Sequence, residues 1–154
     1  MNIYLTYGTG EAPTELSAFD AALFDTGIAN YNLIRLSSVI PDNSKIIEGK
    51  IDWNQREFGH RLYLVMSQQT ETKPGKEAWA GVGWLQDKDG KGLFVEHHGS
   101  SEKLVKENII KSLTNMQKYR PEKFGPIQHK LMGIMCKRQP VCALVCAVFK
   151  SEKW

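Results

Sequence analysis

Several features that would place a protein in a special class are absent from this sequence. No apolar run is long enough to span a bilayer, and the first residues lack the basic region and long apolar stretch of a signal peptide. The formal net charge is only +3 and the lysines are scattered, so composition gives no reason to expect a nucleic-acid partner. We therefore expect a cytoplasmic protein with neither a membrane nor a nucleic acid as partner.

Cysteine is scarce, with three residues in the chain. An odd number cannot form a closed set of disulfides, and the spacing fits no zinc-binding pattern. Cys142 and Cys146 lie in the apolar run 141–149, where free cysteine usually packs as a small hydrophobic residue. The adjacent His97 and His98 would face opposite sides of a strand, which is poor geometry for one ion. We expect no metal site.

The other properties are those of an ordinary globular domain. The chain has 154 residues, of which 42% are apolar and 24% charged, which suits a single domain over 1–154. Apolar periodicity predicts strands over 3–7, 30–41, 61–69, 78–85, 93–98, 130–136 and 141–149, and helices over about 14–26 and 102–119. The polar segment 42–55 is expected to be a loop. Hairpin-joined strands with two separated helices indicate an α+β fold with antiparallel sheets and two main helices.

The strand predicted over 30–41 carries two adjacent hydroxyls, Ser37 and Ser38. Neighbouring residues of a strand point to opposite faces, so one of these serines must share a face with the buried side chains. From residue types alone, the simplest interpretation is a partly exposed strand end.

Three segments, together with the small-residue, apolar C-terminal strand, give the chain a resemblance to a known family. Residues 27–41, Gly-Ile-Ala-Asn-Tyr-Asn-Leu-Ile-Arg-Leu-Ser-Ser-Val-Ile-Pro, resemble the self-cleavage segment of the pyruvoyl-dependent arginine decarboxylases. Residues 16–23 and 92–96 resemble two further segments of that family, in the same order. The resemblance implies a four-layer α-β-β-α sandwich that assembles as a homotrimer or a dimer of trimers, with active sites between subunits.

The resemblance also implies a cofactor made from the chain itself. Decarboxylation leaves a carbanion that protein side chains cannot stabilise, so an electron sink is needed. In the resembled family the second serine, Ser38 here, attacks the carbonyl of Ser37, and elimination and hydrolysis follow. The implied products are residues 1–37 and a chain of residues 38–154 that begins with a pyruvoyl group.

Positions that match the family imply roles for further residues. Asn32 would stabilise the oxyanion formed during cleavage, and Glu96 would return a proton to the substrate's α-carbon after decarboxylation. Asp20 would take the substrate's guanidinium in two parallel hydrogen bonds, Leu16 would cover its methylene chain, and Ser37 would also contact it. Plainer interpretations exist, because an asparagine in this place often bonds to local backbone and a helix-surface aspartate is favoured by the helix dipole.

The implied function is decarboxylation of L-arginine to agmatine and carbon dioxide, for polyamine synthesis or acid tolerance. Two alternatives stay open, namely the same chemistry on another amino acid and a non-catalytic, unprocessed homologue that acts in binding or assembly. The segment 42–55 has no match in the family pattern, which leaves its part in the site open.

Overall fold

The computed structural model describes residues 1–51 and 55–154. Its strands are β1 (Asn2–Glu11), β2 (Asn32–Arg35), β3 (Val39–Ile40), β4 (Lys45–Glu48), β5 (Arg61–Glu71), β6 (Glu77–Gln86), β7 (Gly92–Gly99), β8 (Gln128–Met135) and β9 (Val141–Glu152). The α-helices are α1 (Glu15–Thr26) and α2 (Glu102–Met116), and short 3-10 helices occupy Gln55–Glu57 and Gln117–Tyr119.

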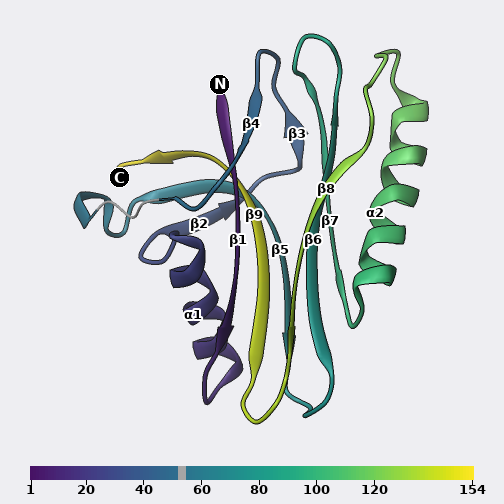
Figure 1. The fold of residues 1–154 in the computed structure, drawn as a ribbon. Helices are drawn as coiled ribbons and strands as arrows, with labels where there is room; N and C mark the ends of the chain where they lie inside the picture. Colours follow the sequence, from purple (N-terminus) through teal and green to yellow (C-terminus); the bar gives the residue numbers. More distant parts are fainter. Residues whose placement is uncertain (52–54) are drawn as a thin grey trace.

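The strands form two sheets. One has the order β2-β5-β9-β1-β4 and the other the order β3-β7-β6-β8. The pairs that hold the sheet centres together are antiparallel, as predicted. The edge pairs β1–β4 and β2–β5 are instead parallel. The C-terminal strand β9 lies between β1 and β5 in the middle of its sheet (Figure 1), so the first and last strands of the chain are neighbours.

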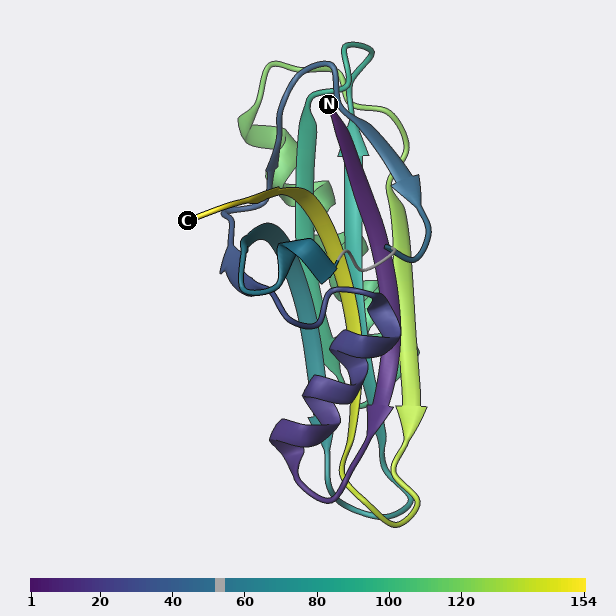
Figure 2. The same ribbon diagram turned by 90° about the vertical axis from the view of Figure 1, so that its left-hand side faces the viewer.

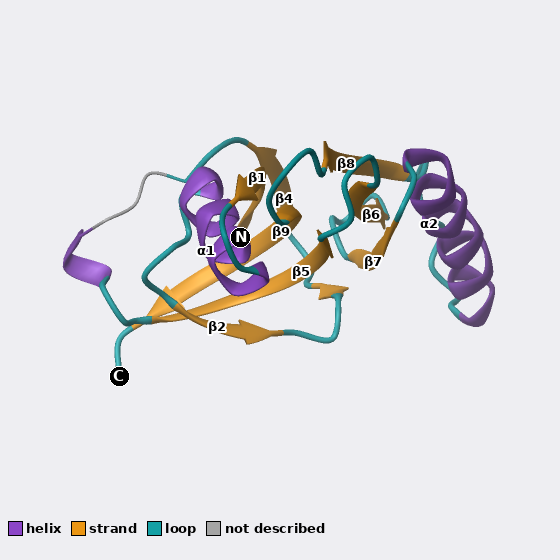
Figure 3. Ribbon diagram, turned by 90° about the horizontal axis from the view of Figure 1, so that it is seen from below, coloured by secondary structure: helices purple, strands orange, loops and turns teal. Residues whose placement is uncertain are grey.

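Apolar clusters divide the molecule into four layers. Between the two sheets lie side chains that include Leu5, Val65, Val82, Phe94 and Val145. The helix α1 packs on the five-stranded sheet, as Figure 2 shows, through a cluster that includes Ala18, Ala22, Leu64, Leu144 and Cys146. The helix α2 packs on the four-stranded sheet through a cluster that includes Leu85, Val95, Val105, Ile109 and Leu113. The two helices thus cover opposite outer faces (Figure 3), which confirms the α+β, four-layer α-β-β-α arrangement.

Local sequence signals set the ends of both helices. Thr14 caps α1 and forms a capping box with Ser17, and Gly27 ends the helix with φ of 79°, a value that glycine adopts without a steric penalty. Ser101 caps α2 through the Leu104 backbone N–H. The helix predicted over 102–119 continues past Met116 only as a 3-10 turn.

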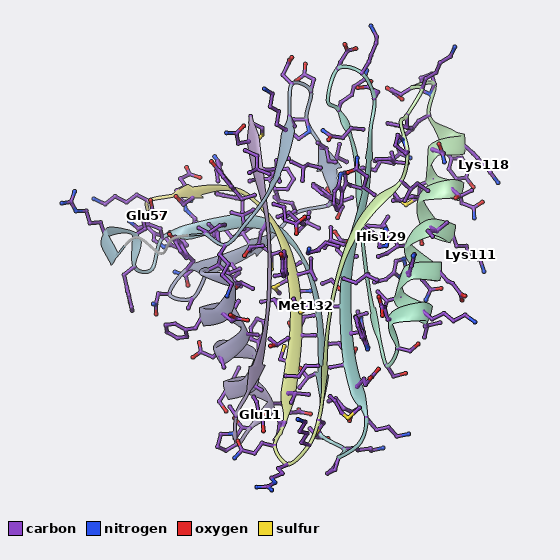
Figure 4. The ribbon with its side chains drawn as sticks, in the orientation of Figure 1. Glu11, Glu57, Lys111, Lys118, His129 and Met132 are labelled. Atoms are coloured by element: carbon purple, nitrogen blue, oxygen red, sulfur yellow. The ribbon has the colours of Figure 1, made fainter. Side chains whose placement is uncertain are left out.

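The two faces of α2 differ as the sequence predicts. The lysines at 103, 106, 111 and 118 are exposed, and Figure 4 shows Lys111 and Lys118 pointing away from the sheet. The buried stripe consists of Val105, Ile109 and Leu113. Leu104, which the periodicity assigns to that stripe, is instead exposed, because the stripe is centred one residue further along the helix.

Glycines let α2 approach the sheet closely. A Cβ atom at Gly83 on β6 would lie 2.1 Å from Cγ2 of Ile109, and one at Gly81 would lie 2.8 Å from Cγ1 of Val105. Only a residue without a side chain fits at such a distance. The sequence Gly81-Val82-Gly83 therefore buries Val82 between the sheets while leaving room for the helix on the other face.

Two of the predicted elements are wrong in detail. The strand predicted over 30–41 is broken, because β2 belongs to the five-stranded sheet and β3 to the four-stranded sheet, with residues 36–38 crossing between them. The loop predicted over 42–55 contains β4, which pairs with β1. β4 is mostly exposed and lies at a sheet edge, so its residues lack the apolar pattern of a buried strand. Residues 52–54 of that segment lie outside the described residues.

The two side edges of the sandwich are built differently. On one side, Lys130 of β8 forms an ion pair with Glu48 of β4 and lies 4.0 Å over the ring of Tyr7, which ties the two sheets together. On the other side, β2 pairs with β5 only from Arg61 to Leu64, and β3 pairs with β7 only at Gly92 and Leu93. Within the described residues, the rest of β5 and β7 has no strand beyond it on this side.

Neither described helix is long and apolar enough to cross a membrane.

Candidate active site

Ser38 lies where the chain crosses from one sheet to the other. The N–H of Leu36 donates to the carbonyl oxygen of Leu64 at 2.9 Å, and the carbonyl oxygen of Ser38 accepts from the N–H of Phe94 at 2.8 Å. Each sheet thus holds one end of the crossing. Ser38 itself has φ of 66°, a left-handed conformation that is uncommon outside glycine and tends to occur at functional sites.

The side chain of Ser38 meets Glu96. Its Oγ donates a hydrogen bond to Oε1 of Glu96 on β7, a residue 58 positions away in sequence. Both side chains are half-buried. The contact joins a hydroxyl next to the Ser37–Ser38 peptide bond to a carboxylate that can accept its proton.

A cavity of about 310 Å³ opens beside this pair, on the side where the described residues place no strand beyond most of β5 and β7. Its size is at the small end of the range of roughly 300–1,000 Å³ for small-molecule sites. The residues that line it are Arg35, Leu36, Met66, Ser67, Gln68, Glu96 and His98.

Buried Ser67 fixes the wall of the cavity. Its Oγ donates to the carbonyl oxygen of His97 at 2.7 Å and accepts from the N–H of Gly81 at 3.1 Å. The hydroxyl therefore ties β5 to β7 and β6 across the two sheets, with its donor satisfied as a buried polar group requires. This cross-link holds β7, and with it Glu96, at a fixed distance from β5.

Asn32 begins β2 and bonds to backbone that is distant in sequence. Its Nδ2 donates to the carbonyl oxygen of Gly59 at 2.6 Å, and its backbone N–H donates to His60 at 2.8 Å. Gly59 also accepts from Nε1 of Trp154 at 2.9 Å. The side-chain acceptor lies 27 positions away in sequence, so this bond is not the local one of the plainer interpretation, and one hydrogen of the side-chain amide remains for another acceptor.

The structure does not bring Asp20 and Leu16 to the cavity of their own chain. Both lie on α1 and are exposed, Leu16 to 77%, and neither lines the cavity. Ser37 is exposed beside Ser38. Of the residues singled out from the sequence, Ser38 and Glu96 are thus in direct contact, whereas Asp20 and Leu16 stand on an outer surface.

Sequence reasoning missed several residues of the cavity. Arg35 and Gln68 have polar side chains on strands, which usually indicates only a solvent-facing position. His98 lines the cavity and its Nδ1 lies 2.6 Å from Oε1 of Gln69. Nothing in residue type or spacing marks these positions, because the cavity forms only when the two sheets are placed side by side.

His97 and the thiol of Cys142 are poor candidates for this site. His97 faces α2, with Nε2 2.8 Å from Oγ of Ser112, and burial together with repulsion from His98 lowers its pKa. Burial raises the pKa of the Cys142 thiol to about 11, and a protonated thiol is a poor nucleophile. Among the described residues, no group of three or more His, Cys, Asp or Glu side chains is arranged to hold a metal ion.

Fold and site together define a small α+β domain in which a strained serine at a sheet crossing contacts a glutamate beside a cavity. The chain belongs to the pyruvoyl-dependent arginine decarboxylase family, whose sequence model matches residues 2–152. The cofactor that the family's name specifies is a pyruvoyl group.

Individual relatives agree with this assignment. The chain is 39% identical over 94 residues to the pyruvoyl-dependent arginine decarboxylase of Halobacterium salinarum, covering 61% of this chain and 58% of that protein. It is 33% identical over 107 residues to the one of Thermoplasma volcanium, covering 67% and 59%. The chain thus aligns with somewhat under two thirds of the length of these relatives. A solved pyruvoyl-dependent histidine decarboxylase has a TM-score of 0.46 and 15% identity, covering 64% of this chain and 57% of that one.

Proposed function

We propose that this protein is a self-processing decarboxylase that converts L-arginine to agmatine and carbon dioxide. The observation that carries the proposal is the contact between Ser38 Oγ and Glu96, formed at a serine with positive φ inside a chain of this family. The location we expect for it is the cytoplasm.

Ser38 is the residue proposed to start the cleavage. Its Oγ bonds to the carbonyl carbon of Ser37 while the bond from that carbon to the nitrogen of Ser38 breaks, and the nitrogen gains the proton. The peptide thereby becomes an ester. Loss of the α-proton of residue 38 then expels the carboxylate of Ser37, and addition of water with release of ammonia leaves a pyruvoyl group on residues 38–154.

Glu96 supports this step as the proton acceptor. Its carboxylate already accepts the hydrogen bond of the Ser38 hydroxyl, so the proton has a place to go as Oγ becomes the nucleophile. Asn32 is the proposed donor to the oxyanion, through the amide hydrogen that Gly59 does not use. The positive φ of Ser38 stores strain, which cleavage relieves.

The residues around position 38 also fit the group that replaces the serine. The N–H of Phe94 holds the carbonyl oxygen of residue 38, and that carbonyl is unchanged by processing. When present, the pyruvoyl group supplies the electron sink that side chains lack. Glu96, beside the same position, is then placed to give a proton to the substrate's α-carbon.

The proposal that arginine is the substrate rests on exposed residues of α1. We propose a homotrimer in which Leu16 and Asp20 of one copy complete the cavity of the next copy. Both side chains are exposed, and the cavity lies at the edge where β2 and β3, among the described residues, pair with only part of β5 and β7. Asp20 can take a planar guanidinium in two parallel hydrogen bonds, which the ammonium of lysine or ornithine cannot form.

The alternatives receive less support. An unprocessed homologue would not need a serine in a strained conformation against a carboxylate. The same chemistry on another amino acid would need a different partner for the side chain than Asp20.

The test is carbon dioxide release from arginine, lysine, ornithine, histidine and aspartate. Arginine should react at least about fivefold better than lysine, because an ammonium leaves polar groups unpaired. Asp20→Asn should raise the KM for arginine without preventing self-cleavage, and sedimentation should show a trimer. Equal rates for lysine and arginine, or an active monomer, would contradict the proposal.

A further inference from the structure

Arg35 stands out among the residues of the cavity. It ends β2, three residues before Ser38, and lines the same cavity as Glu96. Its Nη2 donates to Oε1 of Gln68 at 3.4 Å, a long hydrogen bond to a neutral amide. Within 1–51 and 55–154, Arg35 takes part in none of the salt bridges. A cation without a carboxylate partner thus faces a cavity beside the proposed reaction centre.

We infer that Arg35 binds the α-carboxylate of the amino acid substrate. The inference rests on the proposed function, in which Glu96 protonates the α-carbon and so must lie next to it. The carboxylate on that carbon then lies in the same cavity as Arg35, a cation without a carboxylate partner, and is attracted by it. An arginine side chain can hold a carboxylate with two parallel N–H donors.

The other polar groups of the cavity are less suited to this role. The hydroxyl of Ser67 already donates to His97 and accepts from Gly81. His98 is engaged with Gln69. The amide of Gln68 orients the guanidinium of Arg35 and brings no charge of its own.

An Arg35 that binds the carboxylate would also distinguish the substrate from the product. Arginine carries a carboxylate, whereas agmatine has lost it and keeps only positive groups. Arg35 therefore attracts the substrate and repels the product, which favours release of agmatine after each turnover. The same repulsion turns the substrate's guanidinium away from Arg35 and toward the mouth of the cavity.

The experiment compares the processed Arg35→Gln and Arg35→Lys variants with the wild type, using Arg138→Gln as the matched control. Arg138 lies exposed in the turn between β8 and β9 and loses the same charge. For Arg35→Gln we expect the KM for arginine to rise at least about tenfold, with the inhibition constant of agmatine unchanged or lower. Arg35→Lys should fall between Arg35→Gln and wild type, and Arg138→Gln should match wild type.

Two outcomes overturn the inference. One is an unchanged KM for arginine in active Arg35→Gln, and the other is an equal loss for arginine and agmatine, which would point to a role in shape or assembly. If Arg35→Gln fails to process, the wild-type protein provides the test through L-argininamide, which has a neutral amide in place of the carboxylate. Its inhibition constant should be about tenfold higher than the KM for arginine. Equal values would contradict a carboxylate subsite. A wild type inactive on arginine would instead overturn the proposed function.

Discussion

The adjacent residues Ser37 and Ser38 differ in their burial and hydrogen bonding. Ser38 is half-buried, has φ of 66° and is bonded to Glu96, whereas Ser37 is exposed. We predict that Ser38→Ala abolishes self-cleavage, because no hydroxyl remains to attack the carbonyl of residue 37. Ser37→Ala is the matched control and should still be cleaved. Denaturing electrophoresis of both purified variants checks this, and cleavage in Ser38→Ala would contradict the role of its hydroxyl.

Glu96 is expected to serve cleavage and decarboxylation unequally. In Glu96→Gln the amide oxygen can still accept the hydrogen bond from Ser38, so the variant should fold and be cleaved, at a reduced rate. An amide cannot deliver the proton to the α-carbon, and general acid catalysis contributes about 10²–10⁴-fold. The rate of carbon dioxide release by the matured variant should fall by about 10²–10⁴-fold. Turnover at the wild-type rate would remove Glu96 from the role of acid.

His97 should make stability depend on pH. Burial and the neighbouring His98 lower its pKa, so below the ordinary value of 6.5 the unfolded chain binds a proton more readily than the folded one. The free energy of unfolding should therefore fall as pH drops below 6.5 and level off below the lowered pKa. Urea titrations between pH 7.5 and 5 measure this, and His97→Asn should weaken the dependence. An unchanged dependence in that variant would contradict the assignment.

For single residues, the family resemblance and the structure identify different members of the candidate site. Ser38 and Glu96 come from the family resemblance, and the structure brings their side chains into contact. Arg35 lies within the resembled segment 27–41, yet a charge on a strand predicts only a solvent-facing position. Arg35 shares the cavity with Gln68 and Glu96. These residues lie on other strands, and their proximity to Arg35 could not be predicted from the sequence.

The crossing between β2 and β3 is the element that the sequence hides. Apolar residues run through both strands, so periodicity predicts one strand where the chain changes sheets. The break becomes visible only through hydrogen bonds to two different sheets, at Leu64 and Phe94. The helices were predictable because their caps, Thr14, Gly27 and Ser101, are local signals.

The contact between α2 and β6 depends on Gly83. A methyl group there would meet Ile109 at 2.1 Å, and overpacking of this kind costs about 1–3 kcal/mol. We predict that Gly83→Ala lowers the free energy of unfolding by that amount, measured by urea denaturation. Gly49→Ala is the control, because a Cβ at Gly49 meets nothing within 4 Å and should change stability by no more than about 0.5 kcal/mol. Equal stabilities of the two variants would mean that α2 does not need this close approach.

On the scale of the whole molecule, the two side edges of the sandwich differ in structure and role. The edge with β4 and β8 is closed by Lys130 and Glu48, whereas the edge with β5 and β7 carries the cavity. Apolar patterns predict the α+β fold, and the family resemblance implies the four layers. The sequence cannot predict which edge stays open, since that depends on how far β2 and β3 extend along their neighbours.

The intact mass of the purified wild-type protein tests the central claim most directly. Cleavage between Ser37 and Ser38 should give one chain of 37 residues and one of the remaining 117 of the 154. Their masses should sum to that of the precursor plus one water, added at hydrolysis, minus the ammonia released when the pyruvoyl group forms. The larger chain should resist N-terminal sequencing because it has no free amine. A single chain of 17.4 kDa that stays intact on prolonged incubation would contradict the account.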